Sequence, residues 1–248
     1  MIRLDRFLAN MGIGTRKEVK KLVSSGAVNI NGKPVKDSGI QIDENNDSVT
    51  VMGEVVEYKP FVYLMMNKPA GVLSASEDAR GAITAADLVA EEYGHYGVSP
   101  AGRLDKDSEG FLILTNDGDY IHNVISPNKH VDKVYFCIVE REISEEDIAA
   151  FEKGIKLADG TLCKPARLER ADITENCGEH GFGVCVTIHE GKFHQVKRMF
   201  LARDNKVLYL KRIKIGEVSL DETLEKGEYR EMTQQEVDSI ITEKGANQ

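Results

Sequence analysis

The sequence predicts an α+β fold organised as two domains. Apolar residues recur at helical spacing in some segments, and short apolar runs of strand length occur in others. Clusters of Gly, Pro and Asn separate the two kinds of segment. A chain of 248 residues can bury a sizeable core and can hold one or two domains.

The composition is that of an ordinary soluble globular protein, with 41% hydrophobic and 29% charged residues. No apolar run approaches the length of a membrane span, and residues 1–5 lack the long apolar segment of a signal peptide. We therefore expect a cytoplasmic protein without membrane contact. The cysteines form no Cys-x-x-Cys pair, so we expect reduced thiols at Cys137, Cys163, Cys177 and Cys185.

The charge is distributed unevenly along the chain. The formal net charge of −9 argues against a general nucleic-acid binder. Residues 1–36 nevertheless hold eight Lys or Arg against two acidic residues, and residues 190–214 hold the same numbers. Two basic segments on an acidic chain suit local contact with phosphates, whereas solvated surface faces are the alternative.

The first domain is predicted to be a helix–helix–hairpin unit. Residues 4–11 have helical spacing, and Thr15–Glu18 reads as a capping box that opens a second helix. Residues 27–30 alternate like a strand and lead into the hairpin signal Asn31-Gly32. The basic residues that lie off the apolar stripe of the second helix form a positive face suited to backbone phosphates: Arg16, Lys17, Lys20 and Lys21. We place this domain at residues 1–57 and the second domain at 58–248.

The second domain alternates strand-like and helical segments. Strands are predicted at 62–66, 111–115, 135–139, 184–188, 206–210 and 212–218. Helices are predicted at 84–94, 120–125, 144–155, 196–200 and from 233 onward.

Residues 101–118 are the most unusual stretch. The apolar run 111–115 reads as a buried strand that the turn 116–118 terminates. Charged residues crowd directly before this strand: Arg103, Asp105, Lys106, Asp107 and Glu109. Such charges are costly unless they are paired or used. The residues alone leave two interpretations, a solvated loop with a local ion pair or a functional site.

The same stretch resembles the signature motif of pseudouridine synthases. The resemblance is carried by Gly102-Arg103-Leu104-Asp105, then Gly110, a hydrophobic strand and Asn116-Asp117-Gly118. It is strongest for the RsuA-like branch, which acts on ribosomal RNA, and it covers nearly the whole chain. It implies that Asp105 is the catalytic residue. The N-terminal segment likewise resembles the small RNA-binding domain named after ribosomal small-subunit protein four.

Other blocks of this family recur in order. Asn67-Lys68-Pro69-Ala70-Gly71 resembles a block near the active site, and Lys133-Val134-Tyr135 resembles one whose Tyr stacks on the target base. Residues 190–200 resemble a third block, which implies that Lys197 pairs with the catalytic Asp. Many relatives carry Arg at this position, and a Lys there cannot make a bidentate pair.

Further contacts to substrate or RNA are expected from other basic residues in these blocks: Arg103, Lys68, Arg198 and His194. His189 and His194 stand five residues apart without a carboxylate or Cys at ligand spacing, so no metal site is expected.

The resemblance implies a catalytic domain around a mixed, largely antiparallel sheet, and an enzyme that isomerises a uridine of 16S ribosomal RNA. The reaction needs no redox step or group donor, so no cofactor is expected. Residues 164–169, the compact length and the lack of a long basic tail favour 16S RNA over the alternative, 23S RNA. An alternative of another class is a non-catalytic RNA-binding ribosome-assembly factor. We expect a monomer, and the substrate is either free RNA or a subunit assembly intermediate.

Overall fold

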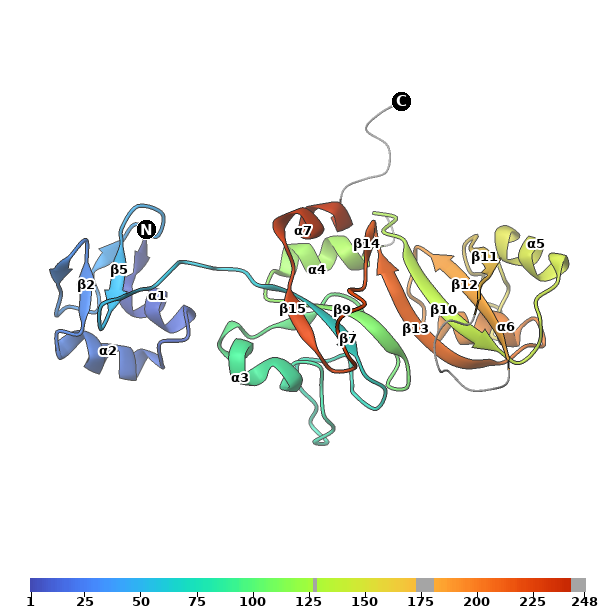
Figure 1. Ribbon diagram of the computed structural model, residues 1–248, viewed down its shortest axis with the longest axis horizontal. Helices are drawn as coiled ribbons and strands as arrows, with labels where there is room; N and C mark the ends of the chain where they lie inside the picture. The colour runs from blue at the N-terminus through green and yellow to red at the C-terminus, as the bar shows by residue number, and fades with distance from the viewer. Residues whose placement is uncertain (127–128, 173–180, 242–248) are drawn as a thin grey trace, which may run out of the picture. The chain divides into compact units, whose positions relative to one another are not determined.

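The N-terminal segment places two short helices against small strands, as the computed structural model in Figure 1 shows. The structure describes residues 1–126, 129–172 and 181–241. Helix α1 spans Leu4–Asn10 and α2 spans Arg16–Ser24. Thr15 and Glu18 form the predicted capping box, because each side chain accepts a hydrogen bond from the backbone N–H of the other. The helices bury a small apolar core: Leu4, Phe7, Leu8, Val19, Val23, Val28, Ile42 and Val49.

Two small sheets complete this segment. One pairs β1 (Ile2–Arg3) with β4 (Gln41–Ile42). The other has the order β3-β2-β5-β6, with bounds Lys33–Pro34, Val28–Ile30, Val49–Val51 and Glu54–Val55. Asn31 and Gly32 connect β2 to β3 with φ values of 50° and 75°. A two-residue hairpin turn of this kind needs positive φ at both positions, which confirms the predicted hairpin.

The remainder of the chain is built on a nine-stranded sheet with the order β11-β12-β10-β13-β9-β7-β15, with β14 beside β13 and β8 beside β9. In chain order the strands are β7 (Tyr63–Lys68), β8 (Ser99–Pro100), β9 (Glu109–Thr115), β10 (Lys133–Val139), β11 (Arg167–Arg170), β12 (Phe182–Ile188), β13 (Val207–Ile215), β14 (Val218–Ser219) and β15 (Tyr229–Glu231). Strands β9 and β13 are parallel, whereas the other described neighbours are antiparallel. The expected mixed, largely antiparallel sheet is confirmed.

The parallel contact between β9 and β13 requires a glycine. Gly110 lies opposite Arg212 and has a φ of +99°. A Cβ atom at Gly110 would lie 2.3 Å from the Arg212 carbonyl oxygen, which is closer than atoms in contact can lie. The missing side chain therefore lets the two backbones approach and places the first residues of β9 beside the middle of β13.

Helices cover the sheet at several places. Helices α4 (Gly118–Ile125) and α7 (Gln234–Ile241) lie side by side, and α5 (Glu145–Lys153) lies against β11 (Figure 1). The core under α4 and α7 includes Met65, Phe111, Ile113, Tyr120, Val124, Ile215, Val237 and Ile240. Helix α6 (Gln195–Leu201) contacts β13, and its Phe200 ring packs 5.1 Å from the Phe151 ring of α5, measured between centroids.

Two predicted elements differ from the structure. The separate strands predicted at 206–210 and 212–218 are wrong, because β13 runs unbroken through Val207–Ile215 and Gly216 then turns the chain into β14. The helix predicted at 84–94 is a succession of short turns. These are the 3₁₀ turn η1 (Asp87–Val89), α3 (Ala90–Tyr93) and the 3₁₀ turn η2 (Gly94–Tyr96).

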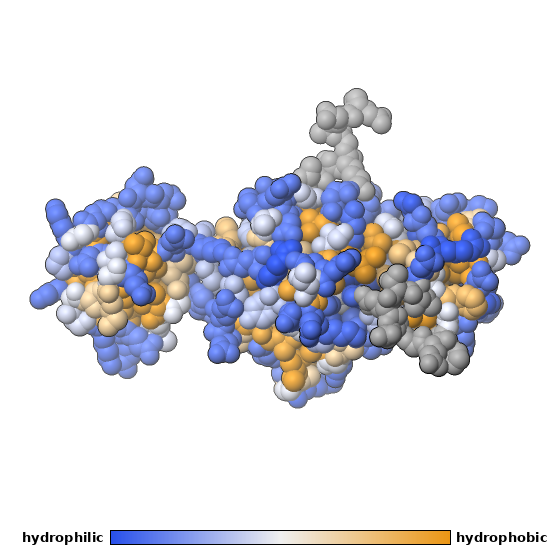
Figure 2. Space-filling model, viewed as in Figure 1, coloured by the Kyte–Doolittle hydropathy of each residue, from blue (hydrophilic) through white to orange (hydrophobic). Residues whose placement is uncertain are grey.

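The chain forms two units, one of Met1–Val62 with Ala90–Val98 and the other of Tyr63–Val89 with Ser99–Gln248. The domain boundary at residue 57 stays a prediction. Figure 2 shows mostly hydrophilic side chains on the visible face, with apolar ones in smaller patches. Among the described residues, every helix is too short or too polar to cross a membrane.

Candidate active site

Asp105 lies in the loop between β8 and β9, and the backbone around it is held firmly. The buried Ser74 hydroxyl donates to the Leu104 carbonyl oxygen and accepts from the Leu104 N–H, both at 3.0 Å. The Ser108 N–H donates to the Asp105 carbonyl oxygen at 3.1 Å. The Asp105 side chain itself remains 21% exposed. The loop therefore presents a fixed carboxylate at the surface.

Lys68 supports this loop from inside. Its ammonium group is fully buried and donates to the carbonyl oxygens of Pro69 and Val72 at 2.9 and 2.8 Å, and to that of Lys106 at 3.4 Å. Burial lowers the pKa of Lys68 to about 8. These bonds tie the turn after β7 to the Asp105 loop. The expected contact between Lys68 and RNA stays a prediction.

Lys197 on α6 joins two carboxylates of the loop. Its Nζ lies 3.0 Å from Asp105 Oδ2 and 2.6 Å from Asp107 Oδ1. Burial acts to lower the pKa of Lys197, but the hydrogen bonds to both carboxylates outweigh it and the pKa is raised. The hydrogen bond from Lys197 also lowers the pKa of Asp107. The geometry agrees with the expected pairing of Lys197 and Asp105, and it adds Asp107, which sequence reasoning did not single out.

The other charge next to β9 has a structural partner. The buried Glu109 carboxylate lies 2.8 Å from Lys226 Nζ and accepts a hydrogen bond from the Tyr209 hydroxyl at 2.9 Å. Two carboxylates of the charged cluster are thus paired, Glu109 with Lys226 and Asp105 with Lys197.

One further predicted residue, His194, lies near the Asp105 carboxylate, whereas Arg198 and Arg103 have other surroundings. His194 Nε2 is 3.5 Å from Asp105 Oδ1. Arg198 donates to the Phe193 carbonyl oxygen at 3.2 Å and pairs with Asp159. Arg103 is exposed in the loop. Their expected contacts with RNA stay predictions.

Tyr135 lies on β10 with 7% of its surface exposed, and its hydroxyl accepts a hydrogen bond from Arg212 at 3.4 Å. Arg212 is 1% exposed and donates from Nε to the Phe111 carbonyl oxygen at 2.7 Å, while one of its terminal nitrogens has no hydrogen-bond partner among the described residues. Arg212 belongs to the basic segment 190–214, but it lies inside the fold and not on its surface. A buried guanidinium that touches Tyr135 is a functional candidate that sequence reasoning missed. The signal was an arginine at the start of the strand predicted at 212–218.

The expected basic face of the N-terminal unit is present on α2, where Arg16, Lys17, Lys20 and Lys21 are all exposed. Of the cysteines, Cys137 and Cys163 are buried free thiols and Cys185 is a half-buried one, whereas Cys177 lies outside the described residues. His189 pairs with Asp132 at 2.9 Å. Within the described residues, no cluster of three His, Cys, Asp or Glu side chains could hold a metal ion.

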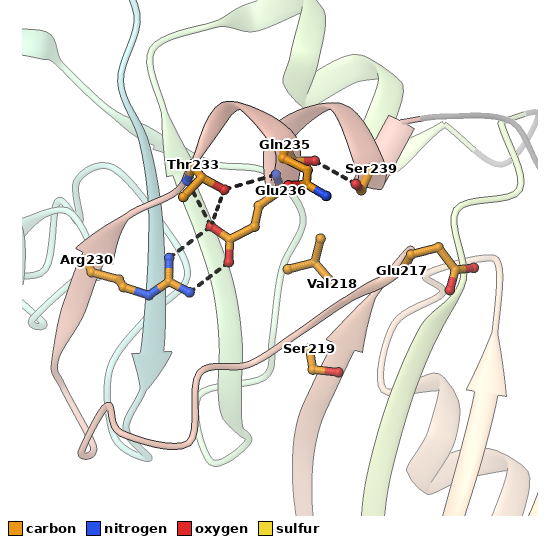
Figure 3. A pocket seen from close by; sticks show the side chains of 8 residues that line it. All are labelled: Glu217, Val218, Ser219, Arg230, Thr233, Gln235, Glu236 and Ser239. Atoms are coloured by element: carbon orange, nitrogen blue, oxygen red, sulfur yellow. Dashed lines mark hydrogen bonds and ion pairs between the residues drawn. The ribbon is translucent and has the colours of Figure 1, made fainter.

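A pocket near α7 is lined by other residues than those described above (Figure 3). Its lining comes from β14, β15, α7 and adjoining turns. Arg230 and Glu236 in its wall pair with each other at 2.7 Å, and this pairing lowers the pKa of Glu236 to about 2. Glu236 also accepts from the Thr233 N–H at the start of α7. These contacts explain the polar wall as a helix-capping network.

Comparisons with known proteins agree with this architecture. Residues 62–202 match the RNA pseudouridylate synthase family, and residues 2–48 match the S4 domain. The chain is 51% identical to the RNA pseudouridine synthase YtzG of Bacillus subtilis, covering 95% of this chain and 97% of that protein. It is 40% identical to ribosomal small subunit pseudouridine synthase A of Vibrio cholerae, covering 96% and 99%.

A crystal structure of a pseudouridylate synthase is similar over 97% of this chain and all of that one, with a TM-score of 0.65 and 37% identity. The match thus extends across both the N-terminal segment and the nine-stranded sheet. The chain belongs to the RsuA-like family of RNA pseudouridine synthases, which are isomerases that act on RNA, and carries an N-terminal S4 domain.

Proposed function

We propose that this enzyme converts one uridine of 16S ribosomal RNA to pseudouridine, with Asp105 as its catalytic carboxylate. The observation that carries the proposal is the pair between Asp105 and Lys197. The pair stands at the surface on a braced loop, with 21% and 25% of the two side chains exposed. A carboxylate held in this way is accessible to a nucleotide and is held in place by its pairing with the ammonium.

The chemistry needs little beyond such a carboxylate. The C1′–N1 bond of uridine breaks, the uracil turns, and a bond forms between C1′ and C5. The C5 proton is then lost and N1 carries a proton in the product, so the reaction is redox-neutral. A carboxylate can attack the sugar or the base as a nucleophile, or it can accept a proton as a base. Lys197 fixes Asp105 for either role.

Tyr135 is the proposed contact for the detached uracil. The target base must leave its stack to reach a carboxylate on the protein surface. An aromatic ring holds such a base by stacking. Arg212 positions this ring, because it bonds the Tyr135 hydroxyl and is itself anchored to β9 through Phe111.

The basic face of α2 supplies contacts to the RNA backbone in this proposal. Arg16, Lys17, Lys20 and Lys21 are exposed, and phosphate contacts give affinity and register without reading sequence. Arg103, Arg198 and His194 would add contacts close to the reacting nucleotide. The enzyme is proposed to work as a cytoplasmic monomer on free RNA or on a subunit assembly intermediate.

The 16S target rests on relatives across the whole chain. Proteins named ribosomal small subunit pseudouridine synthase A match 96% and 97% of this chain at 40% and 38% identity, in Vibrio cholerae and Haemophilus influenzae. The second target, 23S RNA, has no comparable support among these names. Membership of an enzyme family and an intact Asp105–Lys197 pair also disfavour a non-catalytic assembly factor.

The test is conversion in vitro. Purified protein is incubated with 16S and 23S transcripts, and pseudouridine is mapped by carbodiimide labelling and primer extension. The wild type is expected to modify one 16S position, and Asp105→Asn none. Asp107→Asn, which alters a neighbouring carboxylate on the same lysine, is the matched control and is expected to remain active. Modification of 23S RNA alone would overturn the target, and full activity of Asp105→Asn would overturn the catalytic assignment.

A further inference from the structure

An exposed aromatic residue stands next to the proposed catalytic pair. Phe193 is 76% exposed, and its ring stacks on the His194 ring with centroids 3.8 Å apart and planes 19° apart. His194 in turn lies 3.5 Å from Asp105 through its Nε2 atom. The two stacked rings therefore extend from the edge of the Asp105 carboxylate into solvent.

The loop that carries these rings is braced from inside. Glu190 and Gln195 are 6% and 4% exposed, and the Gln195 amide donates to the Glu190 carboxylate at 2.7 Å. The Lys192 N–H donates to the Gln195 side-chain oxygen at 2.9 Å, and the Lys164 N–H donates to Glu190 at 2.9 Å. A buried network of this kind fixes the loop, so the exposure of the aromatic residue is built into the structure.

The backbone at the rings is also held in an uncommon conformation. His194 has a φ of 50°, a backbone angle that residues other than Gly rarely adopt. Arg198 donates to the carbonyl oxygen of Phe193 at 3.2 Å and so anchors the residue before it. Strained residues held by their surroundings concentrate at functional sites. Here the uncommon backbone conformation occurs at the residue whose ring lies beside Asp105.

The surroundings of Phe193 are those of a nucleic-acid surface. Lys192, Lys197 and Arg198 lie within five residues of it, and each is paired with an acidic side chain. Aromatic rings interleaved with basic groups are a common platform for unpaired bases.

We propose that Phe193, backed by His194, is a stacking site for an unpaired base next to the target uridine. The inference rests on the proposed function and deepens it. When the target nucleotide turns out of the RNA, its neighbour loses a stacking partner, and the Phe193 ring replaces that partner. The site thus selects a target whose neighbour is available for stacking, and it favours the extruded state of the uridine.

The test separates stacking from a general loss of structure. Phe193→Ala is compared with Phe193→Trp and with Leu201→Ala, which truncates a 67% exposed apolar side chain at the other end of α6. The substrate is a 16S fragment centred on the mapped uridine, with or without an abasic nucleotide beside it. Phe193→Ala is expected to raise KM about 5- to 150-fold with a smaller change in kcat. Phe193→Trp and Leu201→Ala are expected to stay near the wild type.

The abasic fragments give the decisive comparison. On the fragment that lacks the stacking base, the KM of the wild type is expected to rise to that of Phe193→Ala. The KM of Phe193→Ala is expected to rise no further on this fragment. Equal losses in both proteins, or equal KM values for Phe193→Ala and Leu201→Ala, would overturn the stacking site. Anisotropy of labelled single-stranded 16S fragments gives a binding readout that needs no turnover. Tight binding that depends on Phe193 without pseudouridine formation would refute the proposed function and leave this inference standing.

Discussion

Replacing Gly110 with Ala is expected to destabilise the unit that contains the nine-stranded sheet. Two costs combine at this position. A φ of +99° is unfavourable for a residue with a Cβ by about 1–2 kcal/mol. The added Cβ would also lie 2.3 Å from the Arg212 carbonyl oxygen, and relieving such overlap costs about 1–3 kcal/mol. The expected loss of unfolding free energy is about 2–5 kcal/mol.

Two other glycines of the same region separate these costs. Gly102 has a φ of +96°, but its Cβ would meet Ile125 at an ordinary 3.7 Å, so Gly102→Ala is expected to cost about 1–2 kcal/mol from backbone strain alone. Gly118 has neither problem, and Gly118→Ala at the start of α4 is expected to be neutral or stabilising by up to about 1 kcal/mol.

Urea denaturation followed by far-ultraviolet circular dichroism measures the series. At about 2–4 °C per kcal/mol, thermal scans should place Gly110→Ala about 4–20 °C below the wild type. If Gly110→Ala and Gly102→Ala unfold at the same midpoint, the close approach of β9 and β13 is not what the glycine provides, and the reasoning fails.

Three further outcomes follow from the contacts of the site. Lys197→Met removes a charge-assisted hydrogen bond and is expected to lower kcat about 10- to 100-fold. Asp107→Asn alters a 76% exposed partner and should change kcat less than about 5-fold. Equal effects of the two variants on kcat in steady-state assays would contradict this reasoning. Arg212→Met and Tyr135→Phe are expected to be non-additive in kcat/KM, with a coupling of about 0.5–3 kcal/mol, and additive losses would refute the positioning role. The pKa of Lys68 is about 8 when folded and has its ordinary value near 10.4 when unfolded, so protonation is costly in the fold below pH 8. The stability of the wild type relative to Lys68→Met should therefore rise by about 3 kcal/mol between about pH 8 and pH 10.4, and a flat difference in urea titrations would count against it.

Local sequence signals predicted local structure well. The capping box at Thr15 and Glu18 and the hairpin at Asn31-Gly32 involve residues within four positions of each other, and both are present as expected. The strand 111–115 was also recognised, because its apolar run is continuous. In each case the interactions that stabilise the structure lie within the short segment on which the prediction was based.

Contacts between segments far apart in the sequence could be predicted only in part. The pairing of Asp105 with Lys197 spans 92 positions and came from the family resemblance, not from spacing. The burial of Lys68 and Arg212 could not be read from the sequence, because their partners come from distant segments. Three carbonyl oxygens converge on the Lys68 ammonium at the turn after β7, and the Arg212 guanidinium bonds the Phe111 carbonyl oxygen at the β9–β13 contact.

The stacking role proposed for Phe193 could not have been recognised from the sequence. Phe193 stands in a run of mixed polar and apolar residues, where an aromatic residue is most simply interpreted as core. Only the buried network under the loop, with Glu190 and Gln195 inside, shows that the ring is turned outward.

The most direct test of the account is a map of pseudouridine in 16S and 23S RNA from cells that lack this gene, rescued by the wild type or by Asp105→Asn. The account predicts that one 16S position loses its pseudouridine and that only the wild type restores it. Unchanged maps of both RNAs, or full rescue by Asp105→Asn, would contradict it.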